Sequence, residues 1–141
     1  MIAVDTNILV YAHREELARH DAAKQRLLEL AEGARRWAIP VFCLGEWIRV
    51  VTHPKLFDEP HTAAEAGEAL SRILESPSLV VLSPGGGYWQ LLRQAIEEAD
   101  AVGNLVFDAQ IVALCRESGV RELLTEDRDF DRFDDFPTRR L

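Results

Sequence analysis

Short apolar runs, each too brief for a helix, alternate along this chain with longer segments of helical periodicity. The runs cover residues 2–4, 37–39, 79–82 and 120–125. None of them is joined to the next by the short turn of about two to five residues that marks a hairpin. Strands that are separated by helices pair in parallel, and a parallel sheet needs helices on both faces. The pattern therefore predicts an α/β fold with a central parallel sheet.

Five helices are predicted between these strands. A leucine- and alanine-rich segment predicts a helix from about residue 14 to residue 32, stopped near Gly33. The capping-box spacing of Thr62 and Glu65 begins another, which runs to about residue 74. The other three are expected at residues 40–51, 88–99 and 105–117, with a loop at residues 85–87. Because no repeat, linker or low-complexity segment interrupts the 141 residues, we expect a single domain covering residues 1–141.

The charge balance narrows the function. The formal net charge is −8, with 24 acidic and 16 basic residues. A protein that coats nucleic acid without specificity gains its affinity by neutralising phosphates, so this charge argues against that class. It does not argue against an enzyme that meets phosphate through a bound metal ion, because the ion inverts the local sign.

The apolar segments and the cysteines point to a cytoplasmic location without a membrane. No apolar run approaches the ~20 residues that cross a bilayer, and the first residues lack the pattern of a signal peptide. Cys43 and Cys115 both lie in apolar helical patterns. We expect them to be buried free thiols rather than a disulfide or a metal site.

Two aspartates lie where predicted strands end. Asp5 directly follows the first apolar run, and Asp127 comes two residues after the last. In open parallel sheets, ligands bind beyond the carboxyl ends of the strands. Taken alone, either residue is more often a helix cap or a turn former.

Two further acids lie within apolar helices. Asp108 shares a helical face with Ile111 and Val112, so its carboxylate should point inward. Glu46 lies in a segment that is apolar on nearly every side, where burial of an unpartnered charge is costly. Either acid could instead be structural: Asp108 paired with an arginine, and Glu46 bridged to Arg49.

Together the four acids predict a divalent-metal pocket at one edge of the sheet. Two carboxylates ~4 Å apart repel by about 4 kcal/mol at an effective dielectric near 20. No lysine or histidine lies in these motifs to compensate. Oxygen ligands without imidazole or thiolate favour Mg²⁺ or Mn²⁺ over zinc. The four histidines are expected to be surface or cap residues: His13, His20, His53 and His61.

The expected reaction follows from this acidic pocket and from the absence of other catalytic motifs. No Ser-His-Asp or Cys-His arrangement is apparent, and the glycines at residues 85–87 lack the lysine of a P-loop. A metal ion held by carboxylates can generate hydroxide and stabilise an in-line displacement at phosphorus. Phosphodiester hydrolysis is therefore the reaction that the residues favour.

Four stretches of the sequence resemble a known family. "VDTNILVYA", Glu46 on its apolar helix, "GNLVFDAQIVAL" and "LLTEDRDF" resemble, in order and spacing, the acidic motifs of PIN-domain nucleases. The similarity is greatest to the VapC-type toxins of toxin–antitoxin pairs, and "RVVTHPKLF", "SPGGGYW" and "DFDRF" resemble one subgroup of them. The resemblance covers essentially the whole chain. It implies a PIN-like three-layer α/β/α sandwich.

The resemblance also implies roles for individual residues. Asp5 and Asp108 would be the principal Mg²⁺ ligands, with Mn²⁺ as a possible substitute. Glu46 and Asp127 would complete the catalytic pocket by holding a second ion or orienting the attacking water. Asp129 is a possible auxiliary acid. Three neighbours would support the ligands by hydrogen bonds: Thr6, Asn7 and Thr125.

The implied activity is endonucleolytic cleavage of RNA that leaves a 5′-phosphate and a 3′-hydroxyl. The expected target is transfer RNA or a ribosomal RNA loop, so that translation stops. The expected partners are a second copy of the chain and a cognate VapB-type antitoxin. Such an antitoxin wraps the toxin with its C-terminal segment and can place an arginine in the acidic pocket.

Other classes fit less well. A phosphoacceptor receiver domain needs a late lysine, and neither Lys24 nor Lys55 is late. A haloacid-dehalogenase-type phosphatase needs an aspartate at the position of Asn7. The serious alternative is a non-catalytic PIN-fold module that binds RNA or protein, but a degenerate module would be expected to lose acids. This chain keeps all four.

The sequence also offers candidate residues for contacting RNA, and it suggests how residues 123–133 are oriented. Four arginines could line an entry groove: Arg14, Arg19, Arg49 and Arg93. Trp47 and Trp89 could stack a base, although core or dimer contacts are the favoured interpretation. We expect Phe130 and Phe133 to anchor the acidic segment against the core. Glu126 and Asp131 are expected to face solvent.

Overall fold

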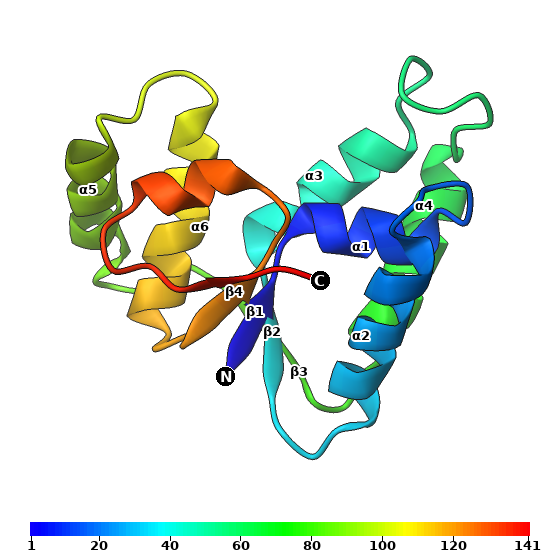
Figure 1. Ribbon diagram of the computed structural model, residues 1–141, viewed down its shortest axis with the longest axis horizontal. Coiled ribbons are helices and arrows are strands. Elements are labelled where there is room, and N and C mark those ends of the chain that lie inside the picture. The colour runs from blue at the N-terminus through cyan, green and yellow to red at the C-terminus, as the bar shows by residue number, and fades with distance from the viewer.

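A computed structural model describes all 141 residues (Figure 1). Secondary structure alternates between strands and helices, as the sequence predicts. The elements in chain order are β1 (Ile2–Val4), α1 (Thr6–His13), α2 (His20–Glu32), β2 (Trp37–Pro40), α3 (Val41–Val51), α4 (Ala63–Leu74), β3 (Leu79–Leu82), α5 (Tyr88–Ala99), α6 (Leu105–Glu117), β4 (Glu122–Leu124), η1 (Arg128–Arg132) and β5 (Thr138–Arg139).

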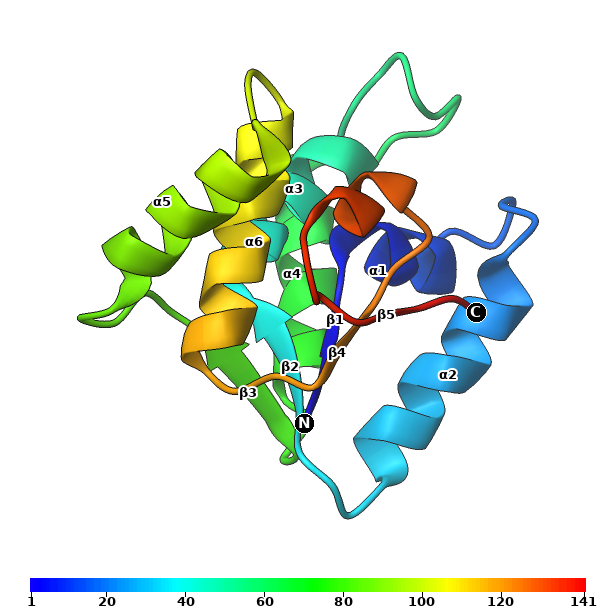
Figure 2. The ribbon, with the colours of Figure 1, turned by 60° about the vertical axis from the view of Figure 1, so that its left-hand side comes forward.

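The five strands form one parallel sheet with the order β3-β2-β1-β4-β5. From β1 the chain moves to β2 and β3 on one side, and then crosses to β4 and β5 on the other. Because crossover connections are right-handed, the two directions place their helices on opposite faces. Figures 1 and 2 show α1 to α4 on one face and α5, α6 and η1 on the other. The predicted three-layer α/β/α architecture is confirmed.

The core lies between the sheet and these helical layers. Trp37 of β2 and Trp47 of α3 are among its largest fully buried side chains. Cys43 and Cys115 are buried and free, as predicted. No helix combines the length and the apolar character that a bilayer crossing requires.

The predicted helix at residues 14–32 is wrong at its start. Within these residues the helix α2 begins only at His20, and a separate helix, α1, ends at His13. A break that begins at Arg14 separates the two helices. The N–H of Arg14 donates to the carbonyl of Val10 and closes α1. Its buried guanidinium donates to the Glu16 carboxylate at 2.6 Å and to the Glu59 carbonyl at 2.9 Å. These tertiary contacts hold the break in a stretch whose residues are good helix formers.

The last strand also differs from the prediction. A strand was expected over residues 120–125, but β4 covers only Glu122–Leu124. A further short strand, β5, pairs with it in parallel, with Thr138 opposite Leu123. Between them, Phe130 and Phe133 are buried as predicted, within and just after the 3-10 helix η1.

Candidate active site

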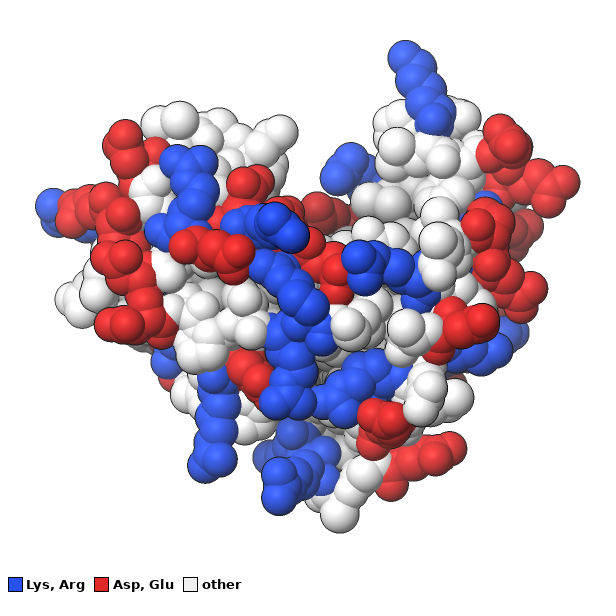
Figure 3. Space-filling model, in the orientation of Figure 1, with Lys and Arg blue, Asp and Glu red and all other residues white.

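The four acids that the sequence singles out line one pocket at the carboxyl end of the sheet. Asp5 follows β1, and Asp127 follows β4, which is paired with β1. The direction of the chain across the sheet reverses between these two strands, which is where open α/β sheets bind ligands. Glu46 comes from α3, and Asp108 comes from the first turn of α6. Figure 3 shows a notch between the two helical layers at this end, with acidic side chains in it.

Asp5 is buried and both of its carboxylate oxygens accept hydrogen bonds. Oδ1 accepts from the backbone N–H of Thr6 at 2.7 Å. Oδ2 accepts from Nδ2 of Asn7 at 2.7 Å and from Oγ1 of Thr125 at 2.6 Å. Burial raises the pKa of Asp5 to about 6, against the opposing hydrogen bonds from Thr125 and Thr6, and repulsion from nearby carboxylates adds to the rise. The side chain is rigidly held in one orientation.

The hydroxyl of Thr125 joins the ends of β1 and β4. Besides donating to Asp5, it accepts from Nδ2 of Asn7 and from the backbone N–H of Asp127, both at 3.0 Å. Thr125 is completely buried. The hydrogen bonds expected of these polar neighbours are therefore present, and they fix the two strand-end aspartates relative to each other.

Asp108 makes no hydrogen bond and no ion pair, so the structure does not support the alternative of a structural aspartate paired with an arginine. Its carboxyl group is partly buried on the cleft side of α6. The pKa of Asp108 is raised to about 7, first by burial and then by the charges of its neighbours Asp127, Asp5, Asp129 and Glu46. An unpartnered carboxyl group with this many acidic neighbours is suited to receive a cation.

Glu46 is more exposed than the apolar pattern of its helix suggests, because α3 turns this side toward the cleft. Its side chain is 42% exposed. Oε2 accepts a hydrogen bond from Oγ1 of Thr6 at 2.6 Å. The alternative bridge to Arg49 exists only as a 3.7 Å contact in which the guanidinium is 63% exposed. Such pairs contribute little, so Glu46 remains available to a ligand.

Asp129 lies at the same cluster. Carboxylate oxygens of Asp108, Asp127 and Asp129 lie within 4.8 Å of one another. The carboxylate of Asp127 accepts from the N–H of Asp129 at 2.8 Å at the start of η1, and this turn presents both side chains on the cleft. The sequence left the role of Asp129 open. The alternation of acids in "EDRDFD" does not reveal that a 3-10 turn gathers two of them.

Only one of the four arginines proposed for RNA entry lines the cleft. That residue is Arg49. Arg14 is buried and Arg93 pairs with Glu97 along α5, while Arg19 forms an ion pair with Glu126 at 2.9 Å. The prediction that Glu126 faces solvent is thus wrong, because its side chain is only 13% exposed.

Aromatic residues near the cleft also differ from expectation. Trp47 belongs to the core, as the favoured interpretation held, whereas Trp89 is exposed. Two phenylalanines line the cleft, Phe42 of α3 and Phe107 of α6, and Phe107, which is 63% exposed, lies beside Asp108. Phe107 directly precedes Asp108, but its place in an apolar segment gives no sign that its side chain is exposed.

The prediction that the histidines are surface or cap residues is wrong for His20 alone, because His13 and His61 are partly exposed. His20 is buried, with Nδ1 3.0 Å from the carbonyl of Tyr11. His13 and His61 place their Nε2 atoms 2.7 Å apart, outside the acidic cluster. His53 accepts from the N–H of Lys55 in a turn, as a cap residue would.

The fold and the pocket together define a class of protein. It is an α/β/α domain with a parallel sheet, in which carboxylates meet at the carboxyl ends of the two strands where the strand order reverses. The family model for the PIN domain matches residues 2–135. The chain therefore belongs to the PIN-domain family.

Its relatives within that family are VapC proteins. A VapC ribonuclease of Mycobacterium bovis is 37% identical over 133 residues, which cover 94% of this chain and 90% of the relative. Ribonuclease VapC48 of Mycobacterium tuberculosis is 33% identical over 132 residues, with coverage of 92% and 90%.

Solved structures share the fold. VapBC2 of Rickettsia felis, bound to a promoter DNA fragment, aligns with a TM-score of 0.73 and 20% identity over 100% of this chain and 99% of that chain. VapC20 of Mycobacterium tuberculosis, a toxin that cleaves the sarcin–ricin loop, aligns with a TM-score of 0.68 and 22% identity over 93% of each chain.

Proposed function

We propose that the protein is a Mg²⁺-dependent endoribonuclease of the VapC type, with Asp5, Glu46, Asp108 and Asp127 as its catalytic residues. The observation that carries the proposal is the pocket in which these four acids meet. A non-catalytic module would have no need to keep Asp108 half-buried without any partner, since that arrangement costs stability. The names of the relatives, which are ribonucleases, support the same activity.

The donor chemistry fits Mg²⁺, or Mn²⁺ in its place. All candidate ligand atoms are carboxylate oxygens, which hard divalent cations prefer. Asp5 and Asp108 would hold the ion together with Asp127, and Asp129 lies close enough to assist. Burial, and after it repulsion from the neighbouring acids, raises the pKa of Asp5 and of Asp108, and a bound cation would offset both effects. A bound ion would supply charge stabilisation at the phosphate and a water molecule of lowered pKa.

The remaining residues position groups for the displacement. Glu46 is oriented by the hydroxyl of Thr6 and is open to the cleft, so it can hold the attacking water and accept its proton. Thr125 and Asn7 hold Asp5 in a single rotamer. In-line attack of this water on phosphorus would break the P–O3′ bond, and the leaving 3′-oxygen would take a proton from solvent, which leaves a 5′-phosphate and a 3′-hydroxyl.

The target proposed is transfer RNA or a ribosomal RNA loop, with arrest of translation as the consequence. A cognate VapB-type antitoxin would neutralise the enzyme in the cytoplasm, and the active form would be a homodimer. Support comes from the structural neighbours, which include VapBC complexes and a toxin acting on a ribosomal RNA loop. An apolar groove between α1, α2 and α4, with Leu27, Leu28 and Ile73 in its lining, offers a surface for an antitoxin segment.

The substitution Asp5→Asn tests the proposal. Loss of a group that merely supports a metal ligand costs about 10–100-fold, so loss of a ligand should cost at least about 100-fold in RNA cleavage. The assay measures Mg²⁺-dependent cleavage of tRNA and ribosomal RNA, sequences the new ends, and follows growth on expression with and without the antitoxin. Asp58→Asn, an identical change at an exposed aspartate without ion pairs, is the control. If folded Asp5→Asn protein cleaves RNA as fast as the parent, the proposed mechanism is wrong.

A further inference from the structure

Five arginines line a groove at the opposite end of the sheet from the acidic pocket. The groove is formed by the loop between α2 and β2, by the starts of β1 and β4, and by β5. Its only acids are Glu29 and Glu122. In a chain with a net charge of −8 this is an unusual concentration of positive charge. We call it the arginine groove, and its basic residues are Arg26, Arg35, Arg36, Arg121 and Arg139.

Three of these arginines have no partner within the protein. Arg26 pairs with Glu29 at 2.9 Å, and Arg139 pairs with Glu122 at 3.0 Å. Arg35, Arg36 and Arg121 are exposed and make neither an ion pair nor a side-chain hydrogen bond. Unpaired guanidinium groups that converge on a groove are free to bind an anion bidentately.

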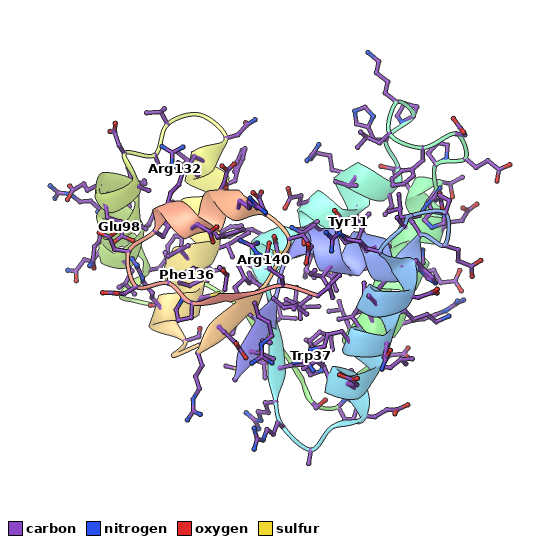
Figure 4. The ribbon with its side chains drawn as sticks, viewed as in Figure 1. Tyr11, Trp37, Glu98, Arg132, Phe136 and Arg140 are labelled. Carbon is purple, nitrogen blue, oxygen red and sulfur yellow. The ribbon has the colours of Figure 1, made fainter.

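The arginine groove is connected to the acidic cleft by further positive charge. Figure 3 shows basic side chains running from the notch across the face over η1 and the segment through β5 to the lower end of the molecule. Figure 4 shows Arg140 on this path, on the segment that passes over β4. The strands β1 and β4 contain three residues each, so the two ends of the sheet are separated by on the order of 10 Å of strand.

The acidic cleft itself cannot supply affinity for RNA. Its carboxylates repel phosphate until a cation is bound, and the net charge of the protein repels it at longer range. Affinity for nucleic acid comes mainly from arginine and lysine on phosphates. An enzyme built around an acidic cleft therefore needs positive surface elsewhere, and the arginine groove is where this chain concentrates it.

We propose that the arginine groove binds phosphates of the RNA substrate outside the cleft, an inference that rests on the proposed ribonuclease function. No aromatic residue lines the groove, so it offers no platform for base stacking. The groove would contact the phosphate backbone of the RNA and would not distinguish its base sequence. It therefore favours RNA long and folded enough to reach from the cleft to the other end of the sheet, and it leaves short single strands unaffected.

The test compares the Arg35→Ala/Arg36→Ala/Arg121→Ala variant with the parent on two substrates. One is unmodified tRNA, and the other is a single strand of about six nucleotides around the mapped cleavage site, which occupies only the cleft. For tRNA we expect KM to rise at least about tenfold with kcat unchanged, and the slope of log KM against log salt to flatten by about 2. For the short strand we expect no change.

Two control variants accompany the triple variant. Arg72→Ala/Arg93→Ala removes two exposed arginines that are paired along α4 and α5, and it should leave both substrates unaffected. The triple lysine variant at positions 35, 36 and 121 retains the charge but not the bidentate geometry, so it should recover part of the tRNA affinity, which separates a binding effect from a folding effect.

The outcomes distinguish the groove from the nuclease function. If the parent cleaves tRNA and the triple alanine variant has the same KM, the groove proposal alone fails. A rise in KM that is equal for tRNA and for the short strand also overturns it, because the effect then lies in the cleft. Loss of antitoxin binding with unchanged RNA kinetics would assign the groove to a protein partner instead. A parent that cleaves no RNA would refute the nuclease function.

Discussion

Asp5 and Asp108 hold protons more tightly than ordinary aspartates do, and for different reasons. Asp5 is buried, and its carboxylate accepts hydrogen bonds from Thr6, Asn7 and Thr125 that partly offset the cost of its charge. Asp108 has no donor at all, and its higher pKa of about 7 reflects burial followed by repulsion from its neighbours. A metal ion entering the cleft must displace these protons, so binding is linked to pH.

Metal affinity should therefore fall steeply in mild acid. With pKa values of about 6 and about 7, we expect the apparent affinity for Mn²⁺ to be constant above about pH 8. It should fall about tenfold per pH unit between pH 7 and 6, and about a hundredfold per unit below pH 6, because one and then two protons compete. Isothermal titration of the metal-free protein measures this. In Asp108→Asn only the lower step should remain, and an affinity independent of pH over this range would contradict the linkage.

At the scale of elements, two of the short elements that sequence periodicity did not predict, α1 and β5, both bear on the site. α1 begins directly after Asp5 and contributes Thr6 and Asn7 to the site. Its apolar and β-branched residues do not form a pattern that predicts a helix. β5 has only two residues and follows a proline, so no pattern of its own identifies it. Its position comes from pairing with β4, a contact between segments that local propensity cannot supply.

Two adjacent arginines, one at the end of β5 and one directly after it, make different contacts. Arg140 directly follows the strand and donates from Nη1 to the carbonyls of Thr125 and Asp127, at 2.8 and 2.7 Å. Those residues form the turn that carries the last acid of the cleft. Arg139 instead pairs with Glu122 on the surface. Arg140 therefore holds the turn in place without touching the cleft, as a positioning residue.

Arg140→Ala should weaken the cation site although Arg140 is not a ligand. Loss of the two hydrogen bonds frees the turn, so we expect about a tenfold loss of Mn²⁺ affinity, together with about 1–3 kcal/mol of unfolding free energy. Arg139→Ala removes a mostly exposed ion pair and should cost less than about 1 kcal/mol, with unchanged metal affinity. Titration calorimetry and urea unfolding measure both effects. Equal metal affinities in the two variants would show that the turn does not need Arg140.

At the scale of the whole molecule, the parallel fold and the meeting of the four acids could be predicted, because both depend on simple rules. Strands that alternate with helices form a parallel sheet, and acids at strand ends and on inward helix faces converge at one edge. The positions of Asp129, Phe107 and the arginine groove could not be predicted in this way. Asp129 and the arginine groove depend on how loops and a 3-10 turn fold back onto the sheet, and the exposure of Phe107 depends on which elements pack beside α6. Periodicity encodes neither.

The convergence of acids has a consequence for the stability of the whole domain. Because the folded-state pKa of Asp108 lies near 7 and its ordinary value is 3.8, the folded protein binds more protons than the unfolded chain between these values. The unfolding free energy of the metal-free protein therefore decreases as pH rises through this window. This loss of stability is complete at and above about pH 8, where Asp5 and Asp108 are both ionised.

Asp108→Asn should thus stabilise the metal-free protein while removing its metal response. In EDTA at about pH 8 we expect the variant to gain about 1 kcal/mol after allowing for solvent screening, or ~4 °C in Tm. The gain should shrink toward zero near pH 4, where the aspartate of the parent is also neutral. Adding Mg²⁺ at about 100 times its Kd should stabilise the parent by about 2.7 kcal/mol, and the variant by much less. Thermal melts at the two pH values, with and without Mg²⁺, measure all three quantities. A variant that melts below the parent in EDTA at high pH would mean that the burial of the Asp108 carboxylate and its repulsion by the neighbouring acids do not limit the stability of the fold.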